Sequence, residues 1–140
     1  MIKANDFRVG NYIMYNESTT WLKVEYIAKT AIGAIDINNI SFYHFKENEI
    51  IPIPLTPEIL EKVGFKLSMG SLTYYLNVFY KEKLYCCLQY LTITSQFELC
   101  KDGFSLLSMP ILFLHQLQNL IHSLKGEELQ INLKELVTVK

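Results

Sequence analysis

The longest helical pattern of the chain lies at residues 111–126, ILFLHQLQNLIHSLKG, and this stretch decides the fold. Its apolar residues recur every three or four positions, which predicts an amphipathic helix lying on a hydrophobic core. The apolar stripe consists of Phe113, Leu117, Leu120, Ile121 and Leu124. Pro110 suits the approach to a helix N-terminus because its missing N–H costs little there. Gly126 can adopt the left-handed conformation that ends many helices.

A meander of strands is predicted before this helix, because apolar and polar residues alternate there. The predicted strands are residues 72–80, 84–91, 97–100 and 104–107. The last two flank Lys101-Asp102-Gly103, which predicts a hairpin because glycine accepts a positive φ. We expect the long helix to cover one face of this antiparallel four-strand sheet, and a final strand to begin at Leu129.

The residues up to 50 predict a smaller sheet. Its strands are expected at residues 12–15, 21–28, 33–37 and 40–45. In the second of these, alternation places Leu22, Val24 and Tyr26 on one side, with Lys23 and Glu25 on the other. Short strands with close turns suggest a curled sheet or a small SH3-like barrel.

A connector with two prolines joins these parts. Residues 49–55, EIIPIPL, are held extended because proline fixes φ, so they predict a stiff connector or an edge segment. A short helix follows, with Thr56 as N-cap, Pro57 in its first position and Gly64 at its end. We therefore predict an α+β fold. Residues 1–50 form a small β-barrel-like sub-part, and residues 51–140 form an α+β sub-part of the same compact domain.

The composition limits the function classes. Hydrophobic residues make up 50% of the chain, which argues against intrinsic disorder. The 13 basic and 14 acidic residues give a formal charge of −1, which disfavours general nucleic-acid binding. No apolar run is long enough to span a membrane, and the N-terminus lacks the apolar run of a signal peptide. The three cysteines suggest reduced thiols, so we expect a cytoplasmic protein.

The sequence contains no motif that indicates catalysis. It has neither a G-x-S-x-G nucleophile elbow nor a glycine-rich phosphate loop. His115 and His122 would stand roughly 10 Å apart along a helix, too far to bind one zinc ion. Adjacent Cys86 and Cys87 would point to opposite faces of a strand. We predict no metal, no cofactor and no catalytic residue, and we leave open a hydrolase that uses a histidine.

One face of the long helix is polar without being charged. It carries His115, Gln118, Asn119 and His122, spaced i, i+3, i+4 and i+7. Amides and neutral histidine offer both hydrogen-bond donors and acceptors. The row is therefore a candidate ligand-binding site, a contact for a partner chain, or a buried network beneath a loop. An ordinary solvent-exposed face is the competing interpretation.

Aromatic residues are the other excess, with nine tyrosines and eight phenylalanines. If the helix covers one face of the meander, Tyr75, Phe79 and Tyr85 lie on the other. An uncovered aromatic face indicates a partner, an oligomer interface or a stacked base. The alternative is that residues 1–50 cover this face.

Three sequence blocks bracket most of the chain and carry a resemblance. They are residues 4–13, ANDFRVGNYI; residues 51–65, IPIPLTPEILEKVGF; and residues 114–120, LHQLQNL, with residues 126–129, GEEL. Together they resemble a family of small uncharacterised proteins encoded by phages and prophages of gut anaerobic bacteria. The resemblance does not extend to residues 66–110. It implies a protein of viral origin in the host cytoplasm, and it carries over no catalytic residue.

These observations favour a non-catalytic binding protein. Small phage proteins of this type often blunt host defence, so the leading hypothesis is a counter-defence factor that sequesters a nucleotide immune signal, such as a cyclic nucleotide. It would act as a homo-oligomer, with tyrosines stacking on the base and Gln, Asn and His binding its polar edges. The first alternative is a factor that blocks a host protein by direct contact. The second is a small hydrolase that uses His115 or His122.

Overall fold

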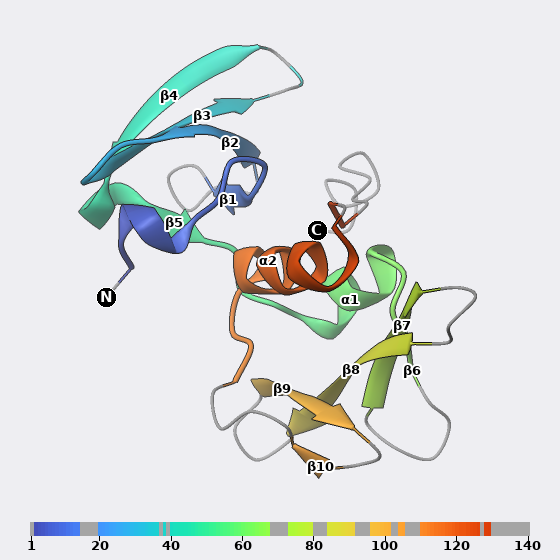
Figure 1. Cartoon of the computed structure of the whole chain (residues 1–140). Helices are drawn as coiled ribbons and strands as arrows, with labels where there is room; N and C mark the ends of the chain where they lie inside the picture. The colour runs from blue at the N-terminus through green and yellow to red at the C-terminus, as the bar shows by residue number, and fades with distance from the viewer. Residues whose placement is uncertain are drawn as a thin grey trace.

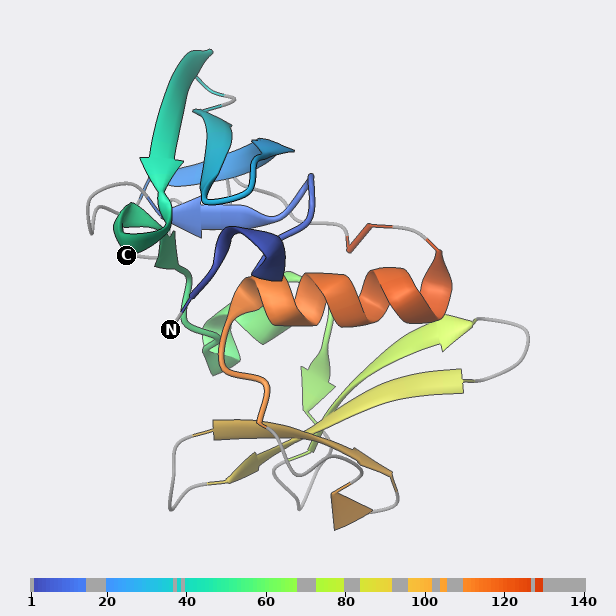
Figure 2. The same ribbon diagram turned by 60° about the vertical axis from the view of Figure 1, so that its left-hand side comes forward.

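Two antiparallel sheets make up the fold, and the longest helix lies between them (Figures 1 and 2). The computed structural model describes residues 2–14, 20–36, 38, 40–67, 73–79, 84–91, 96–101, 104–105, 110–126 and 128–129. Between residues 73 and 105 it describes the strand backbone and the side chains of Leu88, Tyr90, Phe97 and Glu98. The predicted α+β class is confirmed at this level.

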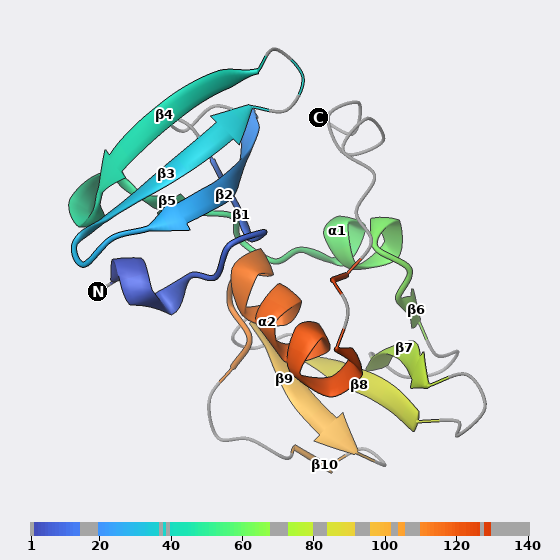
Figure 3. The ribbon, with the colours of Figure 1, turned by 45° about the horizontal axis from the view of Figure 1, so that its top comes forward.

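The first sheet contains five strands in the order β4-β3-β2-β1-β5 (Figure 3). They are β1 (Tyr12–Met14), β2 (Trp21–Ile27), β3 (Ala31–Asp36), β4 (Ser41–Lys46) and β5 (Ile51–Pro52). The four predicted strands are present. The connector supplies the fifth, at an edge where proline is tolerated. Among the described strands β4 does not pair with β5. Of the two predicted forms, the sheet therefore has the curled one and does not close into a barrel.

The second sheet contains five strands in the order β10-β9-β8-β7-β6. They are β6 (Lys66–Leu67), β7 (Thr73–Phe79), β8 (Leu84–Leu91), β9 (Gln96–Lys101) and β10 (Phe104–Ser105). The predicted meander is present, and β6 was not predicted because two residues are too few to show alternation. The final strand expected at residues 129–134 lies almost entirely outside the described residues.

Two α-helices and two 3-10 turns complete the described part of the chain. They are η1 (Ala4–Asp6), η2 (Glu47–Glu49), α1 (Pro57–Lys62) and α2 (Leu114–Lys125). The predicted cap of α1 is confirmed, since the Thr56 hydroxyl accepts a hydrogen bond from the Ile59 amide at 3.2 Å. Gly126 ends α2 with a φ of 74°, as its sequence position predicts. No described helix is long and apolar enough to cross a membrane.

Helix α2 begins at Leu114, three residues later than the periodicity predicts. The reason is that the preceding residues pair with other parts of the chain. The Ile111 amide donates to the Phe97 carbonyl at 2.7 Å, and the Leu112 carbonyl accepts from the Leu55 amide at 2.9 Å. The Gln116 side chain then caps the helix by accepting from the amides of Leu112 and Phe113, at 2.8 and 3.0 Å.

Each sheet has its own hydrophobic core. The first core is built from residues of the first sheet and the N-terminal segment, between Ala4 and Ile50. The second joins α1, α2 and the second sheet, with the fully buried Leu114, Leu117 and Ile121 packed in one cluster with Leu88 and Phe97. Burying one such leucine stabilises the fold by roughly 1.5–3 kcal/mol. The apolar stripe of helix α2 therefore faces the second sheet. Its polar face is directed toward the first sheet.

Candidate functional site

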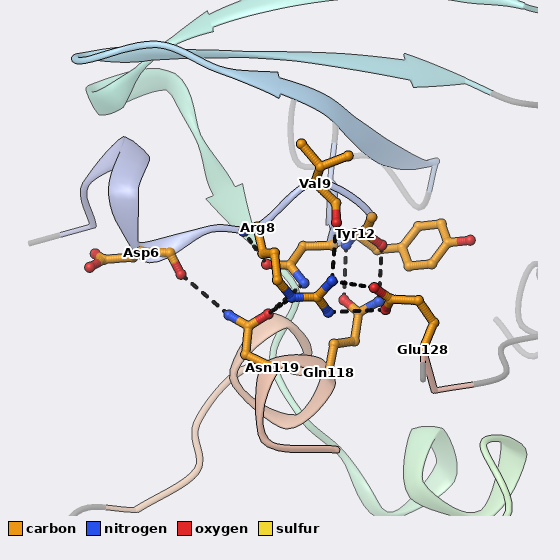
Figure 4. Close-up of polar contacts among 9 residues, drawn as sticks. Asp6, Arg8, Val9, Tyr12, Gln118, Asn119 and Glu128 are labelled. Atoms are coloured by element: carbon orange, nitrogen blue, oxygen red, sulfur yellow. Dashed lines mark hydrogen bonds and ion pairs between the residues drawn. The ribbon is translucent and has the colours of Figure 1, made fainter. Parts of the chain in front are cut away.

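The polar face of α2 lies against the N-terminal turn that leads into β1 (Figure 4). Gln118 is 1% exposed and sits at the centre of this contact. Its side-chain oxygen accepts from the Tyr12 amide at 3.0 Å, and its side-chain nitrogen donates to the Gly10 carbonyl at 3.2 Å. Buried backbone groups need hydrogen-bond partners, and the Gln118 side chain is the partner of both the Tyr12 amide and the Gly10 carbonyl.

Asn119 extends the contact by one residue. Its side-chain oxygen accepts from the Asn11 side chain at 2.9 Å and from the Arg8 Nε at 3.2 Å, while its nitrogen lies 3.5 Å from the Asp6 carbonyl. Asn11 is fully buried, and its own oxygen accepts from the Arg8 amide at 2.7 Å. Asn119 therefore holds both ends of the turn at residues 8–11.

An ion pair closes the contact on its solvent side. The Arg8 guanidinium binds the Glu128 carboxylate with both terminal nitrogens, and the Nη2–Oε2 distance is 3.0 Å. The hydrogen bond from Arg8 lowers the pKa of Glu128, against the effect of partial burial. We call this set the junction; it consists of Asp6, Arg8, Gly10, Asn11, Tyr12, Gln118, Asn119 and Glu128.

The close approach at the junction requires glycine at position 10. Gly10 has a φ of +100°, a conformation that side chains rarely adopt. A Cβ added there would lie 3.2 Å from the Glu128 Oε1. Glycine thus allows both the turn and the contact with the carboxylate.

His115 is buried beside the junction and is 2% exposed. Its ring lies 4.3 Å from the Phe7 ring and 5.8 Å from the Phe113 ring, and its Nδ1 has no hydrogen-bond partner among the described residues. Burial lowers the pKa of His115 to about 4, although the Asp6 carboxylate opposes the shift. The imidazole is therefore neutral at pH 7 and packs as an aromatic ring, out of reach of a substrate.

The structure thus brings together three of the four residues predicted on the polar helix face. His115, Gln118 and Asn119 make internal contacts, as expected for the buried-network interpretation, and the hydrogen bonds of Gln118 and Asn119 leave few donors or acceptors for a ligand. His122 lies further along α2 and is partly exposed. The predicted aromatic residues Tyr75, Phe79 and Tyr85 lie in β7 and β8, and their side chains are outside the described part.

A second candidate surface lies on the outer face of the first sheet. We call it the aromatic face; it consists of Tyr26 in β2 with Phe42 and His44 in β4. Tyr26 is 40% exposed and Phe42 is 56% exposed, and their rings stack at 5.8 Å and 14°. The Tyr26 hydroxyl is 2.5 Å from the His44 Nδ1. Large aromatic side chains grouped in this way on a surface often mark a binding site.

The prediction that Tyr26 shares a face with Leu22 and Val24 is wrong. The pairing of β2 with β3 shifts between Val24 and Tyr26, which is a β-bulge at Glu25. One extra residue turns every later side chain to the opposite face, so Tyr26 points outward while Val24 is buried. Strict alternation could not reveal the bulge, and for this reason the aromatic face was not found from the sequence.

Comparisons of the chain with protein-family models, curated proteins and solved structures find no match. In the described ranges, no three residues among His, Cys, Asp and Glu lie close enough to hold a metal ion.

Proposed function

We propose that this chain is a non-catalytic binding protein that holds its ligand on the aromatic face of the curled first sheet. One contrast supports this proposal. Three of the four polar side chains predicted on the long helix are engaged in the junction or buried, as Gln118 and His115 are, whereas Phe42 and Tyr26 remain exposed. A rigid aromatic surface suits recognition.

The resemblance to phage proteins suggests the biological role of this binding. The protein would be a counter-defence factor in the host cytoplasm, acting as a homo-oligomer that sequesters a nucleotide immune signal. The three blocks that carry the resemblance lie in the junction and in both cores, through residues such as Ile13, Leu60 and Asn119. They therefore account for a shared scaffold, and the binding surface is set by residues outside them.

Calorimetry with the full-length protein and a panel of cyclic nucleotides tests this form of the proposal. We expect heat of binding with at least one nucleotide, and we expect that nucleotide to be recovered unchanged after long incubation. Flat heats across the panel would reject sequestration. Turnover of the nucleotide would instead support the hydrolase alternative, for which the partly exposed His122 is the remaining candidate.

Direct contact with a host protein is the second candidate function. The observation that favours it is Ile40, which is 79% exposed and precedes the strand that carries Phe42. Pull-down from host lysate with wild type and Phe42→Ala distinguishes the two functions. A stoichiometric partner that is retained by the wild type and lost by the variant supports protein contact.

A further inference from the structure

The register of the first sheet groups specific side chains on its outer face. Strand residues that pair directly point to the same side, so each pairing across β2, β3 and β4 gives one row. The rows are Lys23–Ile35–Phe42, Tyr26–Gly33–His44 and Ala31–Lys46. The aromatic face therefore has a lysine, Lys23, in the row of Phe42 and a second lysine, Lys46, in the row beyond His44.

Tyr26 is held flat on the sheet by its two row neighbours. Two strand spacings of about 4.8 Å separate Tyr26 from His44, and the tyrosine ring crosses this gap above Gly33. A Cβ at Gly33 would overlap the Tyr26 ring, so the glycine leaves the space that the ring occupies. The contact between the Tyr26 hydroxyl and the His44 Nδ1 fixes the far end of the ring at 2.5 Å. A ring that is already fixed loses little conformational entropy when a ligand binds.

Phe42 lies beside this ring in a nearly parallel plane. The two rings are inclined by 14° with centroids 5.8 Å apart, so they stack with an offset, and Phe42 is 56% exposed. The exposed face of such a ring is flat, which is the shape that a nucleobase stacks on.

The charges beside the rings are positive on β4 and mixed on β2. Lys46 is exposed two positions beyond His44, and Lys23 shares the row of Phe42. The nearby Glu49 carboxylate is negative and accepts from the Lys46 backbone amide at 2.8 Å. Glu25 is exposed in the bulge of β2. This balance suits a ligand that places one phosphate near Lys46.

We propose that the aromatic face is a stacking site for a nucleobase that carries a phosphate. The base lies on Tyr26 and Phe42, and the phosphate lies beside Lys46. The inference deepens the proposed function and rests on it, because it names the ligand class and the residues that bind it. Free nucleotides and single-stranded nucleic acid share this chemistry, whereas the bases of a duplex are already stacked on one another.

The test uses the full chain and two kinds of probe. Labelled oligothymidylate and oligouridylate are measured by fluorescence anisotropy, and AMP, cyclic AMP and a cyclic dinucleotide by calorimetry. Phe42→Ala and Phe42→Leu are compared with Leu67→Ala, a change at an exposed apolar residue of the second sheet. Lys46→Ala is compared with Lys66→Ala, a change at an exposed lysine of β6.

We expect both Phe42 variants to weaken binding by roughly 5- to 100-fold, because leucine restores apolar area but not the π-face. Lys46→Ala should reduce the salt dependence of oligonucleotide binding by about 0.7 in the slope of log K against log salt, the value of one phosphate contact. The β6 variants should bind as the wild type does.

Each outcome decides the proposal. Binding of oligonucleotides, or of free nucleotides, supports it when the Phe42 variants weaken that binding, and the probe that binds identifies the source of the base. Binding that Phe42→Ala and Tyr26→Ala leave unchanged overturns it, because the site then lies elsewhere. Binding of no probe also overturns it. If a host protein is then captured by the wild type and by Phe42→Leu but not by Phe42→Ala, the binding function stands and the face contacts protein.

Discussion

Replacing Gln118 by methionine removes the central hydrogen bonds of the junction and little else. Methionine has a similar length and flexibility but no strong hydrogen-bonding group. The Tyr12 amide and the Gly10 carbonyl each lose the partner that the structure gives them at 3.0 and 3.2 Å. A buried polar group left without a partner costs about 1–3 kcal/mol. Two such groups, partly offset by the gain from burying an apolar side chain, predict a loss of about 2–4 kcal/mol.

The free energy of unfolding is measured by urea denaturation at pH 7, and hydrogen exchange reports the Tyr12 amide separately. We expect Gln118→Met to lower the unfolding free energy and to speed exchange at Tyr12. Ser123→Ala is the matched control, because Ser123 is exposed on the same helix and its loss should change stability by less than about 0.5 kcal/mol. Unchanged protection of the Tyr12 amide, together with a loss as small as that of Ser123→Ala, would refute the role given to Gln118.

Three further predictions concern other parts of the fold. Burial holds the pKa of His115 at about 4 in the folded protein, below its ordinary value of 6.5, so the unfolded chain takes up the proton first. The stabilising contribution of this residue is therefore complete above pH 6.5 and is lost as the pH falls toward 4. His115→Phe should flatten that part of the stability profile, and an equal slope in the variant would contradict the assignment. Gly33→Ala should destabilise the protein by roughly 1–3 kcal/mol because the new Cβ meets the Tyr26 ring; the cost should shrink in a Tyr26→Ala background, and an equal cost in both backgrounds would argue against this contact. Cys87 and Cys100 pair directly across β8 and β9, at a Cα separation of about 5 Å that a disulfide can bridge. Oxidation of the thiols by diamide should link these two, as shown by peptide mass mapping; Cys87→Ser should abolish the link and Cys86→Ser should leave it, and a Cys86–Cys100 link would show that the register is different.

Local signals predicted most of the elements. Alternation located β2, β3, β4 and β8 to within about two residues, and Thr56 and Gly126 marked helix ends through their own side-chain or backbone preferences. These features depend on residues close together in the sequence. They are for that reason accessible to pattern analysis.

Features set by distant partners were missed or misjudged. The late start of α2 depends on pairing between Ile111 and Phe97, and the short β5 exists only because β1 lies beside it. The bulge at Glu25 reversed the predicted side of Tyr26.

In the candidate site, too, the local pattern was predicted and the distant contacts were not. The sequence revealed a row of uncharged polar residues on the long helix. It did not reveal which part of the chain this row contacts. Gln118 binds backbone 108 positions away, at Gly10, and no periodicity within α2 identifies that partner. A polar helix face without Lys or Glu is a signal for a buried contact, and here it marks the surface that joins the two halves of the chain.

The separation into two cores has a consequence for synthesis on the ribosome. Residues between Ala4 and Ile50 suffice for the first core, so this part can fold soon after it emerges. The second core needs Leu117 and Ile121, which are made late, and until then Leu88 and Phe97 are not covered by α2. The nascent chain therefore passes through a stage in which the first sheet is folded and the incomplete second sheet exposes hydrophobic surface. Chaperones would recognise the chain at this stage. Docking of Gln118 and Asn119 onto the finished leading part then marks the end of assembly.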